Sequence, residues 1–196
     1  MPNDDWWQAL WPDPMDILAK IGIVSGMTVI DLCCGSGYFT APLACLSGPE
    51  GKVIAVDLDS NMLEKARLRV EQEEEARPVA PCVWVAADAC KLDQVLAANT
   101  NVDYLVIANT FHGVPDQTAL SAVVARLLKP GGTFTIINWH ARARTETVVL
   151  GQARGPKDEM RMSPASVEAV VTVAGFTFVQ TIELPPYHYA AVLQVA

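Results

Sequence analysis

Five short, nearly uniformly apolar runs alternate along this chain with stretches of helical periodicity. The runs are Met27–Leu32, Gly51–Val56, Cys82–Ala87, Val102–Ile107 and Thr133–Asn138. Strands that are apolar on both faces are typical of parallel sheets, because helices cover both faces of such sheets. The alternation therefore predicts an α/β fold with an open, doubly wound sheet and right-handed crossovers.

Three helical stretches separate these runs, and their ends can be recognised. They are Tyr38–Ser47, Ser60–Glu75 and Asp116–Leu128. We expect Ser60 to cap the second helix, because a serine side chain accepts a hydrogen bond from a free N–H group of the first turn. The Pro-Gly-Gly sequence at residues 130–132 is expected to end the third helix.

The last part of the chain follows a different pattern. Ser163–Ala174 predicts a helix capped by its first serine, and Phe176–Leu184 and Tyr187–Val195 predict two strands. Only two prolines separate these strands, which is too short for a crossover helix, so this pair must be antiparallel. The length of 196 residues fits one domain of this kind and is too short for two. We expect that single domain to span residues 15–196.

Charge and cysteine content exclude several kinds of partner. The chain has 14 Lys+Arg against 22 Asp+Glu, a net charge of -8, whereas nucleic acids and anionic membranes require a basic face. No run approaches the roughly 18 apolar residues of a membrane helix, and no cationic start precedes an apolar leader. The five cysteines include no C-x-x-C pair. We therefore expect free thiols, no metal site and a soluble, cytoplasmic protein.

A glycine-containing loop, Asp31-Leu32-Cys33-Cys34-Gly35-Ser36-Gly37, follows the first run and opens the first helix. Its glycines let the backbone approach a ligand, and the free N–H groups of the helix attract a negative group. Asp57 ends the second run, 20 residues after Gly37, where a carboxylate can accept both hydroxyls of a ribose. Asp88 ends the third run and can accept a hydrogen bond from the amine of a base. This order predicts a cofactor that contains adenosine.

Two observations weigh against a nicotinamide dinucleotide. The loop lacks the complete G-x-G-x-x-G pattern, because Cys33 replaces the first glycine and Thr40 the last. No tyrosine is followed four residues later by lysine, the pair that short-chain reductases use. A cofactor without a pyrophosphate fits the shorter loop better.

The motifs VIDLCCGSGYFT, VIAVDLD, VAADA, VDYLVIANTFH and LLKPGGTFTIIN resemble the successive motifs of class I S-adenosylmethionine-dependent methyltransferases. The Cys-Cys-Gly loop is similar to that of quinone-biosynthesis C-methyltransferases, and the type 11 methyltransferases are also similar. The resemblance covers residues 15–196 and implies a Rossmann-like sheet with strand order 3-2-1-4-5-7-6 and a reversed last strand. The departure from the family pattern is Cys33, which stands where glycine is usual.

The resemblance also implies which residues bind S-adenosylmethionine. The expected cofactor-binding residues are Asp31, Cys33, Gly35, Ser36, Gly37, Asp57, Leu58, Asp88, Ala89 and Asn109. Asp31 and the loop glycines would surround the methionine part, Asp57 would bind the ribose, and Asp88 would bind the adenine amine. The residue that follows each of the last two acids would flank the adenine ring.

In open α/β sheets, ligands bind beyond the carboxyl ends of the parallel strands. His112 follows the fourth strand, His140 follows the fifth, and the reversed last strand begins with Tyr187 and His188. We therefore expect all three histidines to converge beside the reactive methyl group. His112 or His140 is predicted as a general base, because histidine titrates near neutral pH. Tyr187 and His188 would shape the acceptor pocket; a structural hydrogen-bonding role is the alternative for each histidine.

Two further segments are candidates for closing this pocket. Five of the 14 basic residues follow the fifth run: Arg142, Arg144, Arg154, Lys157 and Arg161. This stretch is either a lid that receives an anionic acceptor or a solvated loop with balanced charges. Three of the five tryptophans lie in the first eleven residues, so residues 1–14 are predicted as an aromatic flap. Packing of this segment on the core or at a homodimer contact is the alternative.

The sequence thus predicts an S-adenosylmethionine-dependent methyltransferase that acts on a small-molecule acceptor. In-line methyl transfer requires the nucleophile to be held about 3–3.5 Å from the methyl carbon, with water excluded. An NAD(P)-dependent reductase and a non-catalytic S-adenosylmethionine-binding protein are the alternatives. The identity of the acceptor, the atom that is methylated and the oligomeric state stay open.

Overall fold

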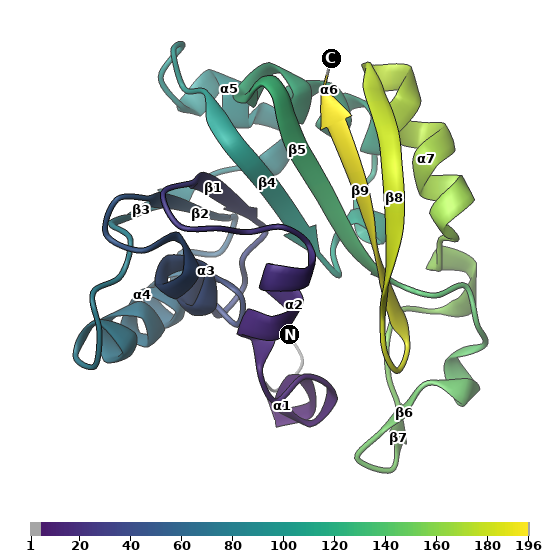
Figure 1. Cartoon of the computed structure of the whole chain (residues 1–196). Coiled ribbons are helices and arrows are strands. Elements are labelled where there is room, and N and C mark those ends of the chain that lie inside the picture. The colour runs from purple at the N-terminus through teal and green to yellow at the C-terminus, as the bar shows by residue number, and fades with distance from the viewer. Residues whose placement is uncertain (1–4, 196) are drawn as a thin grey trace.

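A seven-stranded sheet forms the centre of the protein, and helices lie on both of its faces (Figure 1). The computed structural model describes residues 5–195, and side chains from Trp6 onward. Strand order is β3-β2-β1-β4-β5-β9-β8. The predicted order is confirmed, because β8 and β9 are the sixth and seventh strands of this sheet.

Neighbouring strands from β3 to β5 are parallel, and β9 is antiparallel to both β5 and β8. The strands of the sheet are β1 (Thr28–Leu32), β2 (Lys52–Asp57), β3 (Cys82–Ala86), β4 (Val102–Ala108), β5 (Leu128–Trp139), β8 (Phe176–Leu184) and β9 (His188–Val195). A separate hairpin consists of β6 (Val148–Val149) and β7 (Gln152–Ala153). The start of β5 is the main difference from the prediction: it pairs from Leu128, and its register shifts before Thr133. Pro130 in this interval cannot donate a ladder hydrogen bond, which explains the irregular pairing.

The helices are α1 (Asp5–Leu10), α2 (Pro14–Lys20), α3 (Thr40–Ser47), α4 (Ser60–Glu74), α5 (Leu92–Val95), α6 (Gln117–Leu127) and α7 (Pro164–Val171). Four of them, α3, α4, α6 and α7, lie where the sequence predicts them, whereas α1, α2 and the short α5 were not predicted. Single 3-10 turns cover Ala89–Lys91, Phe111–Gly113, Arg144–Glu146, Asp158–Met160 and Thr172–Ala174. No helix among residues 5–195 combines the length and the apolar character needed to span a membrane.

Two helix caps test the sequence reasoning. Ser163 caps α7, as predicted, and its side chain accepts a hydrogen bond from Ser166 N–H. The predicted cap of α4 is wrong by one residue, because Asp59 and not Ser60 accepts the hydrogen bond from Asn61 N–H. Asp59 has the extended backbone that a capping residue needs, whereas Ser60 already lies in the helix.

The core consists of two apolar layers, one on each side of the sheet. Val29 and Val106 belong to the layer that includes α2 and α3, while Ile30 and Leu105 belong to the layer of α6 and α7. Successive side chains of a strand point to opposite faces, so the central residues of β1 and β4 are apolar on both faces. This buries the sheet on both faces and leaves its carboxyl-end edge for polar residues.

Candidate functional site

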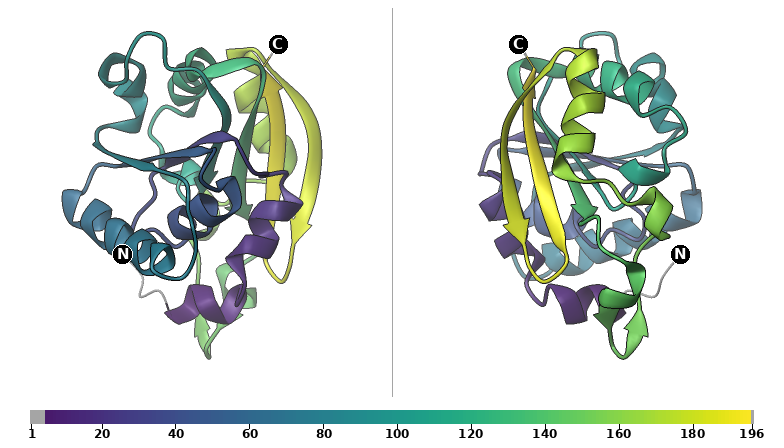
Figure 2. Two further views of the ribbon diagram at one scale, coloured as in Figure 1. Left: turned by 60° about the vertical axis from the view of Figure 1, so that its left-hand side comes forward. Right: turned by 90° about the vertical axis from the view of Figure 1, so that its right-hand side faces the viewer.

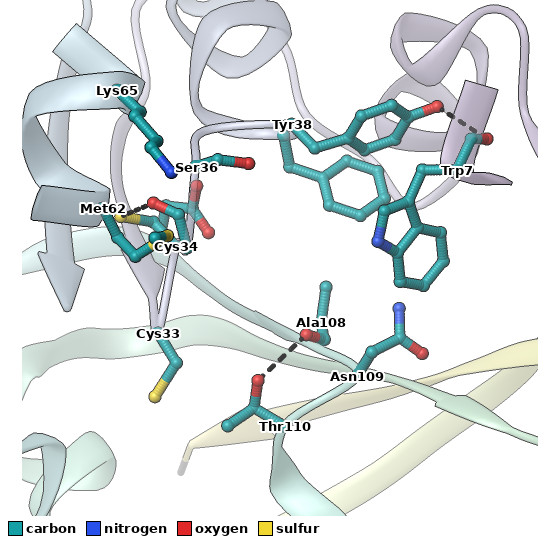
Figure 3. A pocket seen from close by; sticks show the side chains of 13 residues that line it. Trp7, Cys33, Cys34, Ser36, Tyr38, Met62, Lys65, Ala108, Asn109 and Thr110 are labelled. Atoms are coloured by element: carbon teal, nitrogen blue, oxygen red, sulfur yellow. Dashed lines mark hydrogen bonds between the residues drawn. The ribbon is translucent and has the colours of Figure 1, made fainter. Parts of the chain in front are cut away.

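A cavity of about 430 Å³ lies at the carboxyl ends of β1 and β4 (Figure 3). Its lining comes from α1, the loop after β1, α4 and the end of β4: Trp7, Asp31, Cys33, Cys34, Gly35, Ser36, Tyr38, Phe39, Met62, Lys65, Ala108, Asn109 and Thr110. Five of the residues expected to bind the cofactor therefore line one cavity, namely Asp31, Cys33, Gly35, Ser36 and Asn109. We call it the first cavity.

The loop after β1 has the backbone conformation that a glycine-rich ligand loop needs. Cys33 has a φ of 60° without being glycine, so its substitution for the usual glycine leaves the left-handed turn in place. Gly37 has a φ of +84°, and a Cβ there would lie 2.6 Å from the Cα atom of Ala66 in α4. Glycine is required at this position both for the turn and for the close approach to α4.

Asp57 holds this loop against the end of β2. Its carboxylate is buried, with Oδ2 accepting from Gly35 N–H at 2.8 Å and Oδ1 accepting from Asp59 N–H at 3.0 Å. An ionised carboxylate has about four acceptor positions, so each oxygen can still accept a hydrogen bond from a ligand. The tie to Gly35 is a role that the spacing of the sequence did not predict.

The residues expected around an adenine ring lie outside the first cavity. Asp88 is exposed and accepts a hydrogen bond from Cys90 N–H at 3.0 Å, and Ala89 begins the turn that it caps. Leu58 is 78% exposed. These three residues follow β2 and β3, so they share the rim with Asp57 but line an open surface.

Asp31 makes the first cavity suited to a positively charged group. Its buried carboxylate accepts a hydrogen bond from the Thr40 hydroxyl at 2.6 Å. Burial raises the pKa of Asp31 to about 7, although the Thr40 hydrogen bond lowers it and the charge of Asp57 raises it. A cation beside this carboxylate would stabilise its ionised form. Burial also raises the pKa of Cys33 to about 12 and that of Cys34 further, so neither thiol is a nucleophile at neutral pH.

Replacement of Asp31 by asparagine is expected to stabilise the ligand-free protein at pH 8. The folded state keeps its proton up to a pKa of about 7, whereas the ordinary value is 3.8. The contribution of Asp31 therefore lowers the free energy of unfolding of the wild-type protein as the pH rises from about 4 to 7, and this loss remains above pH 7. At about 1.36 kcal/mol per pKa unit, Asp31→Asn should gain on the order of 2–4 kcal/mol at pH 8 and little at pH 4. Urea unfolding at both pH values measures this difference.

Asp103→Asn is the matched control for this measurement. Burial raises the pKa of Asp103, but hydrogen bonds from Lys129 and Thr28 N–H outweigh it and leave the pKa below its ordinary value. Its contribution to stability is present at pH 8 and lost at low pH, so this variant should lose stability where Asp31→Asn gains it. Equal effects of Asp31→Asn at pH 4 and pH 8 would contradict the role of burial.

A second cavity of about 240 Å³ adjoins the first. It is lined by Trp6, Trp7, Asn109, His112, Trp139, Arg144, Arg154, Gly155 and Pro156. Trp7 and Asn109 line both cavities, and they lie close together in Figure 3. Asn109 has a φ of 58°, and neither its amide nitrogen nor its amide oxygen has a partner among the described residues. The junction of the two cavities thus holds an unused donor and an unused acceptor.

The three histidines share the rim but have different environments. His112 lines the second cavity, and its Nδ1 lies 3.3 Å from Asn138 Oδ1. His140 Nε2 lies 2.9 Å from a Glu183 carboxylate oxygen. His188 is fully buried, 4.0 Å from the Trp139 ring, and burial lowers its pKa well below the ordinary value. His112 lines a cavity, and neither of the other two lines these cavities within the described part of the chain, so the expected convergence of all three histidines on one pocket is not found there.

The Nδ1 atom of His112 faces Asn138 Oδ1, and an amide oxygen only accepts hydrogen bonds. In the tautomer that donates from Nδ1 to this oxygen, Nε2 has a free lone pair. Burial lowers the pKa of His112. The hydrogen bond to Asn138 raises this pKa by a smaller amount and the charge of Arg161 lowers it again, so the pKa lies below its ordinary value. The ring is therefore neutral at pH 7 and is able to accept a proton.

Trp139 is a residue of the second cavity that no sequence motif marked. Tyr187 stacks on it at a centroid distance of 6.2 Å and donates a hydrogen bond to Val148 O at 3.0 Å. Tyr187 and His188 thus contact a lining residue instead of lining the cavity themselves. The sequence analysis also did not predict that Met62 and Lys65 of α4 line the first cavity, because a tertiary contact brings them there.

The tryptophan-rich N-terminal segment forms a wall of both cavities. Trp6 and Trp11 are buried, Trp7 lines both cavities, and Trp6 also lines the second cavity. The Tyr38 hydroxyl donates to the carbonyl oxygens of Trp7 and Trp11, and Trp11 Nε1 donates to Pro185 O at 2.9 Å. Figure 2 shows α1 beside the β6–β7 hairpin. Core packing and cavity lining, predicted as alternatives, therefore occur together, and residues 1–4 of the predicted flap lie outside the described residues.

Comparison with known protein families identifies one match over most of the chain. Residues 23–173 match the model of a family described as methyltransferase domain. The demethylmenaquinone methyltransferase of Lactococcus lactis subsp. lactis is 31% identical over 133 residues, which are 68% of this chain and 48% of that protein. That of Geobacillus stearothermophilus is 31% identical over 117 residues, 60% of this chain and 47% of that protein. The chain thus spans about half the length of the curated relatives it matches.

Solved structures share the fold over the whole chain. A SAM dependent methyltransferase from Aquifex aeolicus has a TM-score of 0.82 at 24% identity, covering 99% of this chain and 94% of that one. The magnesium protoporphyrin IX methyltransferase of Synechocystis PCC 6803 with bound SAM has a TM-score of 0.67 at 16% identity, covering 98% and 90%. At these identities the likeness establishes the architecture.

Proposed function

Because this chain belongs to the methyltransferase domain family, we propose that it is an enzyme that transfers the methyl group of S-adenosylmethionine to a small-molecule acceptor. The observation that carries this proposal is the glycine loop of the first cavity. This loop lies at the carboxyl end of β1, and a hydrogen bond to Asp57 of β2 holds it there. The family match favours methyl transfer over the nicotinamide-dependent alternative.

The residues of the first cavity fit S-adenosylmethionine. Asp31 gives a buried carboxylate for the positively charged methionine end, and Asn109 has an unused donor and acceptor. Asp57 and Asp88 would bind the ribose and the adenine amine on the open rim, where Leu58 and Ala89 have exposed or half-buried surface for the ring. The bound cofactor would supply an electrophilic methyl group on a positively charged sulfur.

We propose that His112 removes the proton of the acceptor. In the tautomer that donates to Asn138, its Nε2 atom has a free lone pair, and the Asn138 contact holds the ring. Trp7 and Trp6 line the second cavity and form an apolar part of its wall. This geometry favours His112 over His140, which is paired with Glu183.

We propose a small organic acceptor that carries an anionic group. The curated relatives are named for demethylmenaquinone, and the second cavity has both aromatic and cationic lining. A reducing, cytoplasmic setting is proposed from the five free cysteines. The homodimer stays a prediction.

Calorimetry with S-adenosylmethionine and S-adenosylhomocysteine, followed by incubation with methyl-labelled cofactor and a metabolite extract, tests the function. We expect both compounds to bind and mass spectrometry to find a labelled small molecule. Binding without any labelled product would favour the non-catalytic alternative. Absence of binding, together with a thermal shift on addition of a nicotinamide cofactor, would overturn the proposal.

A further inference from the structure

We propose that the second cavity is an acceptor subsite for a flat aromatic carboxylate, bound between the indole ring of Trp7 and the guanidinium groups of Arg144 and Arg154. This inference rests on the proposed function, since it assigns the acceptor class of the same site. The cavity adjoins the first through Trp7 and Asn109. A ligand there would lie next to His112 and to the loop of the first cavity.

The shape of the acceptor follows from the aromatic walls. Trp6 and Trp7 stack on each other at a centroid distance of 3.9 Å with an interplanar angle of 28°, and Trp139 lies 5.8 Å from Trp6. Trp6 and Trp139 are buried, so the half-buried Trp7 provides the indole surface for a ligand. Indole faces favour flat aromatic partners, which contact them over a larger area than a puckered ring does. A volume of about 240 Å³ accommodates a molecule of one or two fused rings.

The charge of the acceptor follows from two arginines whose guanidinium groups have no carboxylate partner among the described residues; the Arg144 backbone N–H donates to Asp158 Oδ1 at 2.6 Å. Neither Arg144 nor Arg154 forms an ion pair among residues 6–195. The Nε atom of Arg154 is buried and has no hydrogen-bond partner within that range, and Arg144 Nη2 makes only a long, 3.4 Å contact with Ala153 O. A planar carboxylate matches the fork of a guanidinium group and accepts two parallel hydrogen bonds from it.

A third arginine holds this part of the cavity in place. The buried Arg161 guanidinium group donates to Thr147 Oγ1 at 2.9 Å and to Arg154 O at 3.0 Å, and it lies 5.4 Å from the centre of the Trp139 ring. At Gly155, a Cβ atom would lie 2.8 Å from Trp139. The loop therefore contacts the Trp139 ring directly, and Arg154 reaches the cavity from a fixed backbone. Such preorganisation reduces the entropy lost on binding.

Binding of 2-naphthoate and of its neutral counterpart 2-naphthamide tests the subsite. Titration calorimetry on the wild-type protein should show dissociation constants in the millimolar range or tighter, with the carboxylate bound about tenfold more tightly than the amide. In Arg154→Gln the affinity for 2-naphthoate should fall about tenfold, while that for 2-naphthamide stays constant. Arg144→Gln should act in the same direction. Cyclohexanecarboxylate, which has the charge without the flat ring, should bind more weakly than 2-naphthoate.

Arg142→Gln is the matched control, because Arg142 is exposed in the same segment but is not among the lining residues. It should leave both affinities unchanged. Equal binding of the two naphthyl compounds, no binding of either in the millimolar range, or equal losses in Arg142→Gln and Arg154→Gln would overturn the subsite. S-adenosylhomocysteine is titrated separately into each variant. Failure of that titration alone would overturn the proposed function, and its success without naphthoate discrimination would overturn only the subsite.

Discussion

Asp57→Ala is expected to weaken the binding of S-adenosylmethionine about 100-fold. The substitution removes the acceptor that holds Gly35 N–H at 2.8 Å and the carboxylate proposed to bind the ribose. The glycine loop loses its tie to β2, and the ligand loses a charge-assisted hydrogen bond. Titration calorimetry with S-adenosylmethionine and S-adenosylhomocysteine measures the loss.

Asp103→Ala is the control for this experiment. Asp103 also accepts a hydrogen bond from a backbone N–H group, that of Thr28 at 2.8 Å, but it lies at the opposite end of the strands. Its removal should lower the free energy of unfolding and leave cofactor affinity unchanged. If Asp57→Ala and Asp103→Ala reduce affinity alike, the effect comes from general stability and the proposed cofactor site is wrong.

His112→Asn is expected to lower kcat by about 10² to 10⁴-fold, with cofactor affinity unchanged. The asparagine amide keeps a donor for Asn138 Oδ1 but has no basic nitrogen at the position of Nε2. The rate of product formation is measured with the acceptor that the labelled-methyl experiment identifies. The loss should appear in kcat and kcat/KM together, since proton removal occurs in the transition state.

The pH profile separates a base from a structural histidine. Burial lowers the pKa of His112 below its ordinary value of 6.5, so wild-type activity should be constant above that value and fall as the pH drops through the lower pKa. This acid limb should disappear in His112→Asn. His140→Gln, which keeps a donor for Glu183, should retain the limb and near wild-type turnover. Retention of the acid limb in His112→Asn would refute the assignment.

Local patterns were sufficient for most of the fold. Continuous apolar runs such as Val102–Ile107 predicted strands buried on both faces, and the two prolines at 185 and 186 predicted the antiparallel last pair. The predictions that were wrong concern the ends of elements, namely the cap of α4 and the start of β5. Asp59 and Ser60 are both good caps, and β5 starts at Leu128 because this residue also pairs with Val102 of β4, ahead of the register shift.

Several of the residues expected to bind the cofactor share one cavity, whereas the residues expected around the acceptor do not. The loop residues and Asn109 line one cavity because they follow strands that lie next to each other. The positions of the histidines at strand ends did not show which of them faces a cavity. His112 faces a cavity whereas His188 packs against Trp139, and only the packing of β5 against β9 and α1 decides between these environments.

By itself, then, the sequence determined the strand and helix alternation and the position of the ligand edge, since both follow from periodicity and from the residues at strand ends. The order of the strands was implied by the resemblance of its motifs to a known family. The tertiary structure alone decided which side chains share a cavity. Trp7, His112, Trp139 and Arg154 are far apart along the chain but line one cavity. Their proximity depends on packing between distant elements, and no local pattern encodes such contacts.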